Sequence, residues 1–257
     1  MKLRLDYRKS AQENATSYYQ LSKELAKKEE GARQAIVQTG KELESAFAQG
    51  KKASLEKKGP VMKRKKEWYE KYRWFFTSGG KLVVAGRDAK QNDQLFSKVM
   101  KDGDLFFHAD IQGAPATILV GGKNASEMEK MEAAQFAASH SSAWKVGAAS
   151  VDVYAVEKSQ LAKHSSGGFV GAGGFAISGE REWFRSTGLA LAVGIKEGVV
   201  VCLPAVHPES QSAQAQLSPG NYEKGQAAKK LGVLLGAGMD EVLLALPSGR
   251  FAIKENK

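Results

Sequence analysis

Aromatic and cationic side chains crowd into one short stretch of the chain, from residue 63 to residue 76. Unpaired bases stack on aromatic rings and phosphates pair with lysine or arginine, so this mixture is typical of a surface that holds RNA loops and ends. Alternate residues of a strand point to opposite faces, so we expect Trp74 and Phe76 to enter the core while Arg73 and Phe75 share the other face. We therefore favour packing for the tryptophans and RNA contact for the neighbouring cations.

The positive charge of the chain is concentrated beside these aromatic residues. The net charge is +10, and residues 51–73 carry 10 Lys/Arg against 3 Asp/Glu. A polyanion that binds such a patch releases counterions, which gives salt-sensitive binding with little sequence information. The alternative is a solvated helix face that keeps an arm soluble. The candidate RNA contacts in this segment are Lys63, Arg64, Lys65, Lys66 and Arg73.

Gly86-Arg87-Asp88 is predicted to lie where a strand meets a helix. Free amides and the positive end of the helix dipole favour anions at that position, and Arg87 would then bind a phosphate through both arms of its guanidinium. Alternatively, Arg87 pairs internally with Asp88 or Asp110 and fixes the junction without touching a ligand. Both interpretations stay open, and Asp88 itself is expected to cap the helix.

Four further polar residues belong to the candidate RNA site. Gln91 and Asn92 begin the predicted helix, where asparagine is a poor helix former, so a local hydrogen-bonding task is expected. His108 and Asp110 share one face at a strand end and would orient one another or a ribose hydroxyl. A hydrolase would also need a nucleophile and an oxyanion site, and the sequence identifies neither. A structural histidine is therefore favoured over RNA contact, and RNA contact over catalysis.

The order of these residues resembles the carboxy-terminal RNA-binding module of the NFACT family, NFACT-R, in an archaeal-type member. The shared features are Trp68, Tyr69, Arg73, Trp74, Phe75, Gly86-Arg87-Asp88, Gln91-Asn92 and His108-Ala109-Asp110, with further likeness in residues 5–19 and 156–179. The resemblance implies a non-catalytic ribosome quality control module that recognises large ribosomal subunits obstructed by peptidyl-tRNA and supports carboxy-terminal tailing of the stalled nascent chain. Its implied partners are large-subunit rRNA, tRNA and the stalled nascent-chain complex. The family's large amino-terminal domain and helix-hairpin-helix segment have no room in this chain.

The expected fold is α+β, a mixed sheet with flanking helices (residues 73–257), preceded by a short antiparallel helical arm (residues 1–72). A capping box at Ser10 and Glu13 starts a long helix with a narrow apolar seam, Gly50 offers a turn, and residues 61–72 form the returning helix. In the second part we expect a hairpin of 73–77 and 81–85, helices over 126–139 and 221–235, and strands over 105–109, 116–120, 151–156, 174–178, 189–195, 199–203, 242–246 and 250–253.

Composition narrows the remaining possibilities. The single cysteine, Cys202, excludes an internal disulfide, and the four histidines show no paired ligand spacing, so no metal is expected. Neither phosphate-loop spacing nor a dinucleotide fingerprint occurs, so no cofactor is expected. No apolar run approaches the roughly 20 residues that cross a bilayer, which favours a cytoplasmic protein with no membrane partner. The alternative functions are a coiled-coil adaptor that binds protein, or an RNA-processing enzyme using His108 and Asp110.

Overall fold

The computed structural model describes residues 5–55, 66–165 and 168–256. The chain divides into two compact units, Met1–Lys65 and Lys66–Lys257. No helix among the described residues is long and apolar enough to cross a membrane.

The first unit contains one long helix, α1 (Ala11–Leu55). Its predicted capping box is confirmed: the Glu13 backbone N–H donates to Ser10 Oγ at 3.3 Å and the Ser10 N–H donates to Glu13 Oε2 at 2.7 Å. The expected turn at Gly50 is wrong, because the helix continues to Leu55. One helical glycine costs only about 1 kcal/mol, and good helix formers follow it.

The apolar seam of α1 is open to solvent within this unit, with Leu25 55% and Ile36 72% exposed. Of the predicted returning helix over 61–72, residues 61–65 lie outside the described residues. The remainder holds only a 3-10 turn, Trp68–Lys71, which belongs to the second unit.

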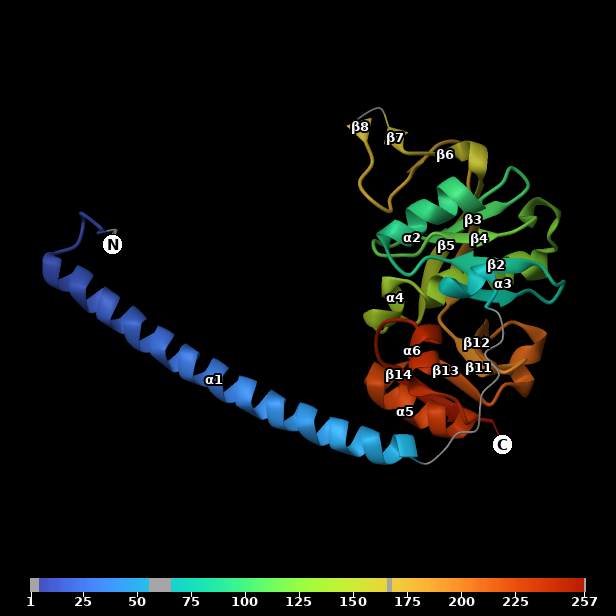
Figure 1. Ribbon diagram of the computed structural model, residues 1–257. Helices are drawn as coiled ribbons and strands as arrows, with labels where there is room; N and C mark the ends of the chain where they lie inside the picture. The colour runs from blue at the N-terminus through green and yellow to red at the C-terminus, as the bar shows by residue number, and fades with distance from the viewer. Residues whose placement is uncertain (1–4, 56–65, 166–167, 257) are drawn as a thin grey trace. The chain divides into compact units, whose positions relative to one another are not determined.

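The second unit is built on a six-stranded sheet, whose strands β2, β3, β4 and β5 are labelled in Figure 1. Its strand order is β1-β2-β4-β3-β5-β10, and each neighbouring pair is antiparallel. The bounds are β1 Arg73–Phe76, β2 Leu82–Ala85, β3 Leu105–Ala109, β4 Thr117–Leu119, β5 Ser150–Glu157 and β10 Glu182–Gly188. The predicted first hairpin is confirmed, with Arg73 opposite Ala85 and Phe76 opposite Leu82.

Both faces of this sheet are packed. Helix α3 (Glu127–Ser139) contributes Phe136 to one core, whose ring centroid lies 4.7 Å from that of Phe75. Helix α2 (Ala89–Gln94), the π-turn Leu95–Val99 and the segment around Phe175 close a second core on the other face. The expected placement of Trp74 and Phe76 is therefore wrong in part: Phe75 is fully buried, Trp74 is half-buried in the second core and Phe76 is 36% exposed. Each face of β1 packs into a core: Phe75 into the first and Trp74 into the second.

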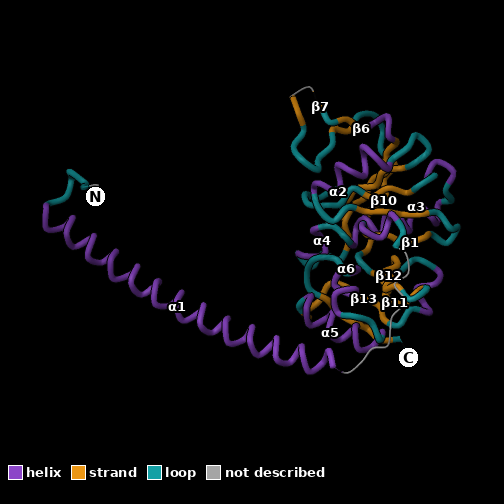
Figure 2. The backbone as a smooth tube through the Cα atoms, in the orientation of Figure 1, coloured by secondary structure: helices purple, strands orange, loops and turns teal. Residues whose placement is uncertain are grey.

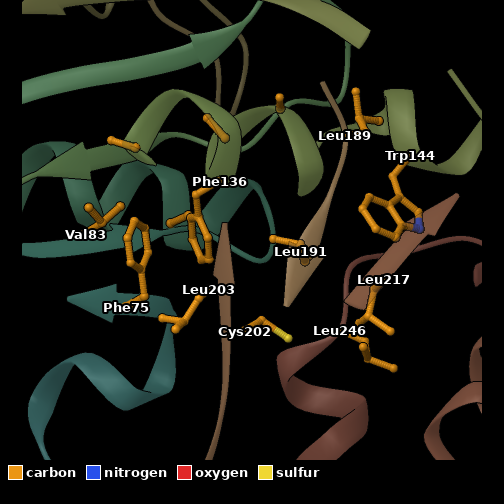
Figure 3. Packing of buried hydrophobic residues seen from close by; sticks show 14 of the residues in the cluster. Phe75, Val83, Phe136, Trp144, Leu189, Leu191, Cys202, Leu203, Leu217 and Leu246 are labelled. Carbon is orange, nitrogen blue, oxygen red and sulfur yellow. The ribbon is translucent and has the colours of Figure 1, made fainter. Parts of the chain in front are cut away.

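A second, four-stranded sheet lies below the first in the view of Figure 2. Its order is β12-β11-β13-β14, again antiparallel. The bounds are β11 Leu191–Lys196, β12 Val199–Pro204, β13 Ala215–Tyr222 and β14 Phe251–Glu255. Figure 3 shows its Leu191 and Leu203 facing Phe136 and Phe75, so the two sheets share one core.

Helices α5 (Lys224–Leu235) and α6 (Met239–Ala245) pack against the second sheet. The strand expected over 242–246 is wrong, because this run is the helix α6. Its leucines and alanine favour a helix, and Asp240 and Glu241 stabilise the positive end of its dipole. Strands β10 and β13 were not predicted, since their sequences lack clear alternation. Helix α4 spans Ser142–Lys145, and two small strand pairs are β6 (Leu161–Ala162) with β9 (Ala176–Ile177) and β7 (His164–Ser165) with β8 (Gly168–Phe169). Short 3-10 helices cover Gly122–Asn124, Lys158–Gln160 and Pro208–Ser212. The α+β class is confirmed.

Candidate nucleic-acid interface

Arg87 follows β2 and joins three distant parts of the second unit. Its Nε donates to the Lys71 carbonyl at 3.1 Å, its Nη2 donates to the Tyr72 carbonyl at 3.0 Å, and its Nη1 donates to the Leu244 carbonyl. The pairing with Asp88 or Asp110 considered from the sequence does not occur among the described residues. Arg87 instead ties the 3-10 turn before β1 to the carboxyl end of α6, where free carbonyls attract a cation.

Arg73 and Lys224 lie in the same region as Arg87, and the three together are called here the cation cluster. Arg73 Nη1 donates to the Gly86 carbonyl at 2.6 Å, while its Nε is buried without a partner in the described structure. Lys224, the first residue of α5, donates from Nζ to the Leu246 carbonyl at 3.0 Å. The contacts of the cluster are therefore carbonyl oxygens, and its three positive charges meet no carboxylate at hydrogen-bond distance among the described residues.

Burial and the closeness of like charges lower the pKa values of the cation cluster. Burial, and secondarily the charge of Arg87, lowers the pKa of Arg73 to about 10. Burial followed by the charges of Arg73 and Arg87 lowers the pKa of Lys224 as well. Arginine keeps its proton at neutral pH, so the repulsion between the Arg73 and Arg87 guanidinium groups favours any anion that approaches.

His140 and Cys202 are buried beside the cation cluster, where the imidazole is a weak base and the thiol a poor nucleophile. Burial, then the charges of Arg73, Arg87 and Lys224, holds the pKa of His140 well below its ordinary value, so the ring is neutral at pH 7. Burial raises the pKa of the Cys202 thiol to about 12. A thiol with that pKa forms almost no thiolate, which is the reactive species.

The motif after Arg87 satisfies its own polar groups. Asp88 caps α2 as predicted, with its Oδ1 accepting from the Gln91 N–H at 2.8 Å. Gln91 accepts from the Arg87 N–H at 3.0 Å and donates to the Lys71 carbonyl at 3.2 Å. Asn92 Oδ1 accepts from the Ala116 N–H at 3.1 Å, and a Cβ at Gly86 would lie 2.0 Å from that oxygen. The expected local hydrogen-bonding tasks of Gln91 and Asn92 are present, and glycine is required beside them.

His108 and Asp110 lie at the end of β3, away from a catalytic arrangement. His108 Nδ1 is 3.3 Å from the Tyr154 hydroxyl, and its ring stacks on Phe106 with centroids 6.1 Å apart. Burial lowers the pKa of His108, and the nearby Asp110 carboxylate opposes that shift. No hydrogen bond joins His108 to Asp110 in the part of the chain that the structure describes. The Tyr154 phenol beside His108 positions the imidazole without activating a nucleophile.

The basic run 63–66 divides at the edge of the described structure. Lys63, Arg64 and Lys65 lie outside the described residues, and Lys66 is exposed. RNA contact by these four residues stays a prediction.

Two cations that the structure places near the candidate residues were missed from the sequence. Lys224 completes the cation cluster, and the Arg181 guanidinium lies 4.6 Å from the ring centroid of Tyr154, the partner of His108. The capping box formed by Glu223 and Gln226 is a signal that would have located Lys224 at a helix start. No signal in the sequence brings Arg181 to Tyr154, because that pairing comes from the register of β10 on β5. Within residues 5–55, 66–165 and 168–256, no three His, Cys, Asp or Glu side chains gather as a metal site would require.

Comparison with known proteins places these residues in a family. Residues 71–179 match the NFACT protein RNA binding domain. This segment includes Arg73, Arg87, Asp88, Gln91, Asn92, His108 and Asp110. The chain belongs to the NFACT family.

Relatives of this NFACT chain are ribosome quality control proteins by name. The archaeal Rqc2 homologue aRqcH of Methanocaldococcus jannaschii is 38% identical over 208 residues, 77% of this chain and 31% of that protein. The ribosome quality control complex subunit NEMF homologue of Drosophila melanogaster is 31% identical over 194 residues, 74% of this chain and 20% of that protein. The chain thus spans about a third or less of these relatives. A solved carboxy-terminal part of the fibronectin/fibrinogen-binding protein of Streptococcus suis is 26% identical over 51% of this chain and 49% of that one, with a TM-score of 0.39, too low to establish a shared fold.

Proposed function

We propose that this chain is an RNA-binding module of a ribosome quality control factor that acts on large ribosomal subunits obstructed by peptidyl-tRNA. The observation that carries the proposal is the match of residues 71–179 to the NFACT RNA-binding domain, which contains seven of the candidate RNA-contact residues. The names of the relatives, a ribosome quality control subunit among them, support the choice of partner.

The role of the cation cluster is to present positive charge from a rigid scaffold. Arg73, Arg87 and Lys224 are held by backbone carbonyls, so their positions are fixed before RNA arrives. Fixed groups lose little conformational freedom on binding, and cations without carboxylate partners attract phosphates over a range of about 10 Å at 0.1 M salt. We assign the cation cluster to long-range attraction and the exposed Lys66 to direct phosphate contact.

On this proposal the partners are large-subunit rRNA, tRNA and the stalled nascent-chain complex, and the chain supports carboxy-terminal tailing while the ribosome performs peptide transfer. We assign recognition of the obstructed subunit to the described residues, and no selection of the incoming tRNA is assigned to them.

Co-sedimentation with isolated large subunits, with and without peptidyl-tRNA, tests the proposal. We expect co-sedimentation that is stronger when peptidyl-tRNA is present and that weakens steeply between about 0.05 and 0.2 M salt. Equal co-sedimentation with and without peptidyl-tRNA would refute the proposal that the chain distinguishes obstructed subunits from free ones. Salt-insensitive pelleting would favour the protein-binding adaptor, since apolar contacts through the α1 seam do not release counterions.

A further inference from the structure

Strand β10 is the edge strand of the six-stranded sheet, and Arg181, which precedes it, Trp183 and Arg185 occupy alternate positions along the chain. Arg185 lies with its guanidinium 3.9 Å from the Trp183 ring centroid, and Arg181 lies 5.8 Å from the same ring. Trp183 pairs in register with Tyr154 of β5, with ring centroids 5.4 Å apart. Arg181, Trp183, Arg185 and Tyr154 are called here the β10 ladder.

A bulge in β10 sets the position of Arg185. The register with β5 shifts between Phe184 and Thr187, and Ser186 has a φ of 48°, which is uncommon for a residue other than glycine. Asp152 of β5 holds both bulged residues: its Oδ1 accepts from the Ser186 N–H at 2.7 Å and its Oδ2 accepts from Arg185 Nη1 at 2.7 Å. Strained backbone persists where its surroundings determine it, and here the result is a guanidinium fixed over an indole.

The ladder includes a cation, Arg181, that forms no ion pair in the described ranges. Nearby, Glu182 pairs with Lys130 at 3.0 Å and Asp152 pairs with Arg185 at 2.7 Å, while the Asp110 carboxylate acts on His108 and Tyr154 without a salt bridge to Arg181. Arg181 is exposed and has no carboxylate partner there, and its positive charge is felt at His108. A nucleotide has a negative phosphate and a planar base. An unpaired cation can bind the phosphate, and stacked planar groups on an exposed sheet edge can bind the base.

We infer that the β10 ladder binds single-stranded RNA. An unpaired base stacks on the outer plane of the Arg185 guanidinium, which Trp183 and Asp152 hold in place, and an adjacent phosphate pairs with Arg181. This inference rests on the proposed function, since it assumes that the chain binds RNA. Three of the four ladder residues, Arg181, Trp183 and Arg185, lie beyond the family match, which ends at residue 179.

Single-stranded RNA and a duplex distinguish the ladder from a general basic surface. A paired base is already stacked and cannot lie on Arg185, so the ladder predicts preference for the single strand. Fluorescence anisotropy would be measured with a fluorescent oligouridylate and with a duplex of equal length, using the full chain.

The variants are Arg181→Gln, Arg185→Lys and a charge-matched control, Lys229→Gln, at an exposed lysine of α5. We expect Arg181→Gln to weaken single-strand binding on the order of tenfold and to lower the salt slope by about one unit. We expect Arg185→Lys, which keeps the charge but removes the plane, to weaken single-strand binding by a similar factor and to leave duplex binding nearly unchanged. Lys229→Gln is expected to leave both affinities nearly unchanged.

The outcomes separate this inference from the proposed function. Parent-like single-strand affinity of Arg181→Gln and Arg185→Lys, while the parent binds subunits, would overturn the ladder and leave the proposed function standing. Equal losses for all three variants would also overturn it, since only net charge would then matter. A parent that binds neither RNA nor subunits would refute both. Melting temperatures within about 2 °C of the parent would confirm that each variant is folded before affinities are compared.

Discussion

Replacing Arg87 with lysine would test whether this residue is a scaffold or a phosphate contact. The guanidinium donates to three backbone carbonyls, those of Lys71, Tyr72 and Leu244, and a lysine ammonium keeps the charge but cannot span all three. A hydrogen bond with a charged donor contributes about 1.5–3 kcal/mol, and partial exposure lets water replace part of each loss. Losing two of the three contacts should therefore lower the free energy of unfolding by about 2–3 kcal/mol.

For a unit of this size, that loss corresponds to a fall in melting temperature of about 5–10 °C. Thermal melting followed by circular dichroism measures it, and urea unfolding gives the free energy independently. Arg181→Lys is the matched control, because Arg181 is exposed and its guanidinium lies over rings without a carboxylate partner in the described structure, so its melting temperature should change little. Amide exchange in α6 should rise in Arg87→Lys alone, since that helix loses the guanidinium contact with its Leu244 carbonyl. A parent-like melting temperature combined with weaker RNA binding would refute the scaffold role and assign Arg87 to phosphate.

Three further predictions concern other parts of the chain. Replacing the four cations of residues 63–66 with glutamine should weaken RNA binding and reduce its salt slope by up to about four units, while changing stability by less than about 0.5 kcal/mol; an unchanged slope would mean that the run is only a solvated face. Burial raises the pKa of Glu129, but hydrogen bonds from Ser126, Lys81 and Thr77 outweigh it and lower that pKa to about 2, so its stabilisation is present above the unfolded pKa near 4.3 and is lost as pH falls toward 2. Urea unfolding at pH 6 and pH 3 should therefore show a smaller acid-induced loss in Glu129→Gln than in the parent, and equal losses would contradict this reasoning. Cys202 should resist iodoacetamide in the folded protein at pH 8 and react in urea; rapid alkylation of the folded chain would show that the thiol is neither buried nor of raised pKa.

Features with local causes could be predicted from the sequence. The Ser10–Glu13 box, the hairpin after Arg73 and the Asp88 cap each depend on residues within a few positions of one another. The α6 helix was missed because a short apolar run does not distinguish a buried helix from a strand.

The candidate site was harder to foresee because its contacts are distant in sequence. The motif located Arg87, but its Leu244 partner lies 157 residues away. The β10 ladder depends on a strand register and a bulge that no local pattern specified. Sequence reasoning thus identified which side chains are unusual, whereas their partners came from the tertiary structure.

The link from Arg87 to the Leu244 carbonyl also has a consequence for how the protein is made. It closes a loop of 157 residues, among the longest-range contacts described for the chain, and the entropy cost of such closure delays it until the intervening strands have formed. During synthesis α6 emerges after both strands of the first hairpin. The hydrogen bond from Arg87 to the Leu244 carbonyl therefore forms only after α6 has been made. A chain interrupted before residue 244 would carry the complete RNA-binding motif with this arginine unanchored. The Arg87 junction is therefore completed only after translation has passed α6.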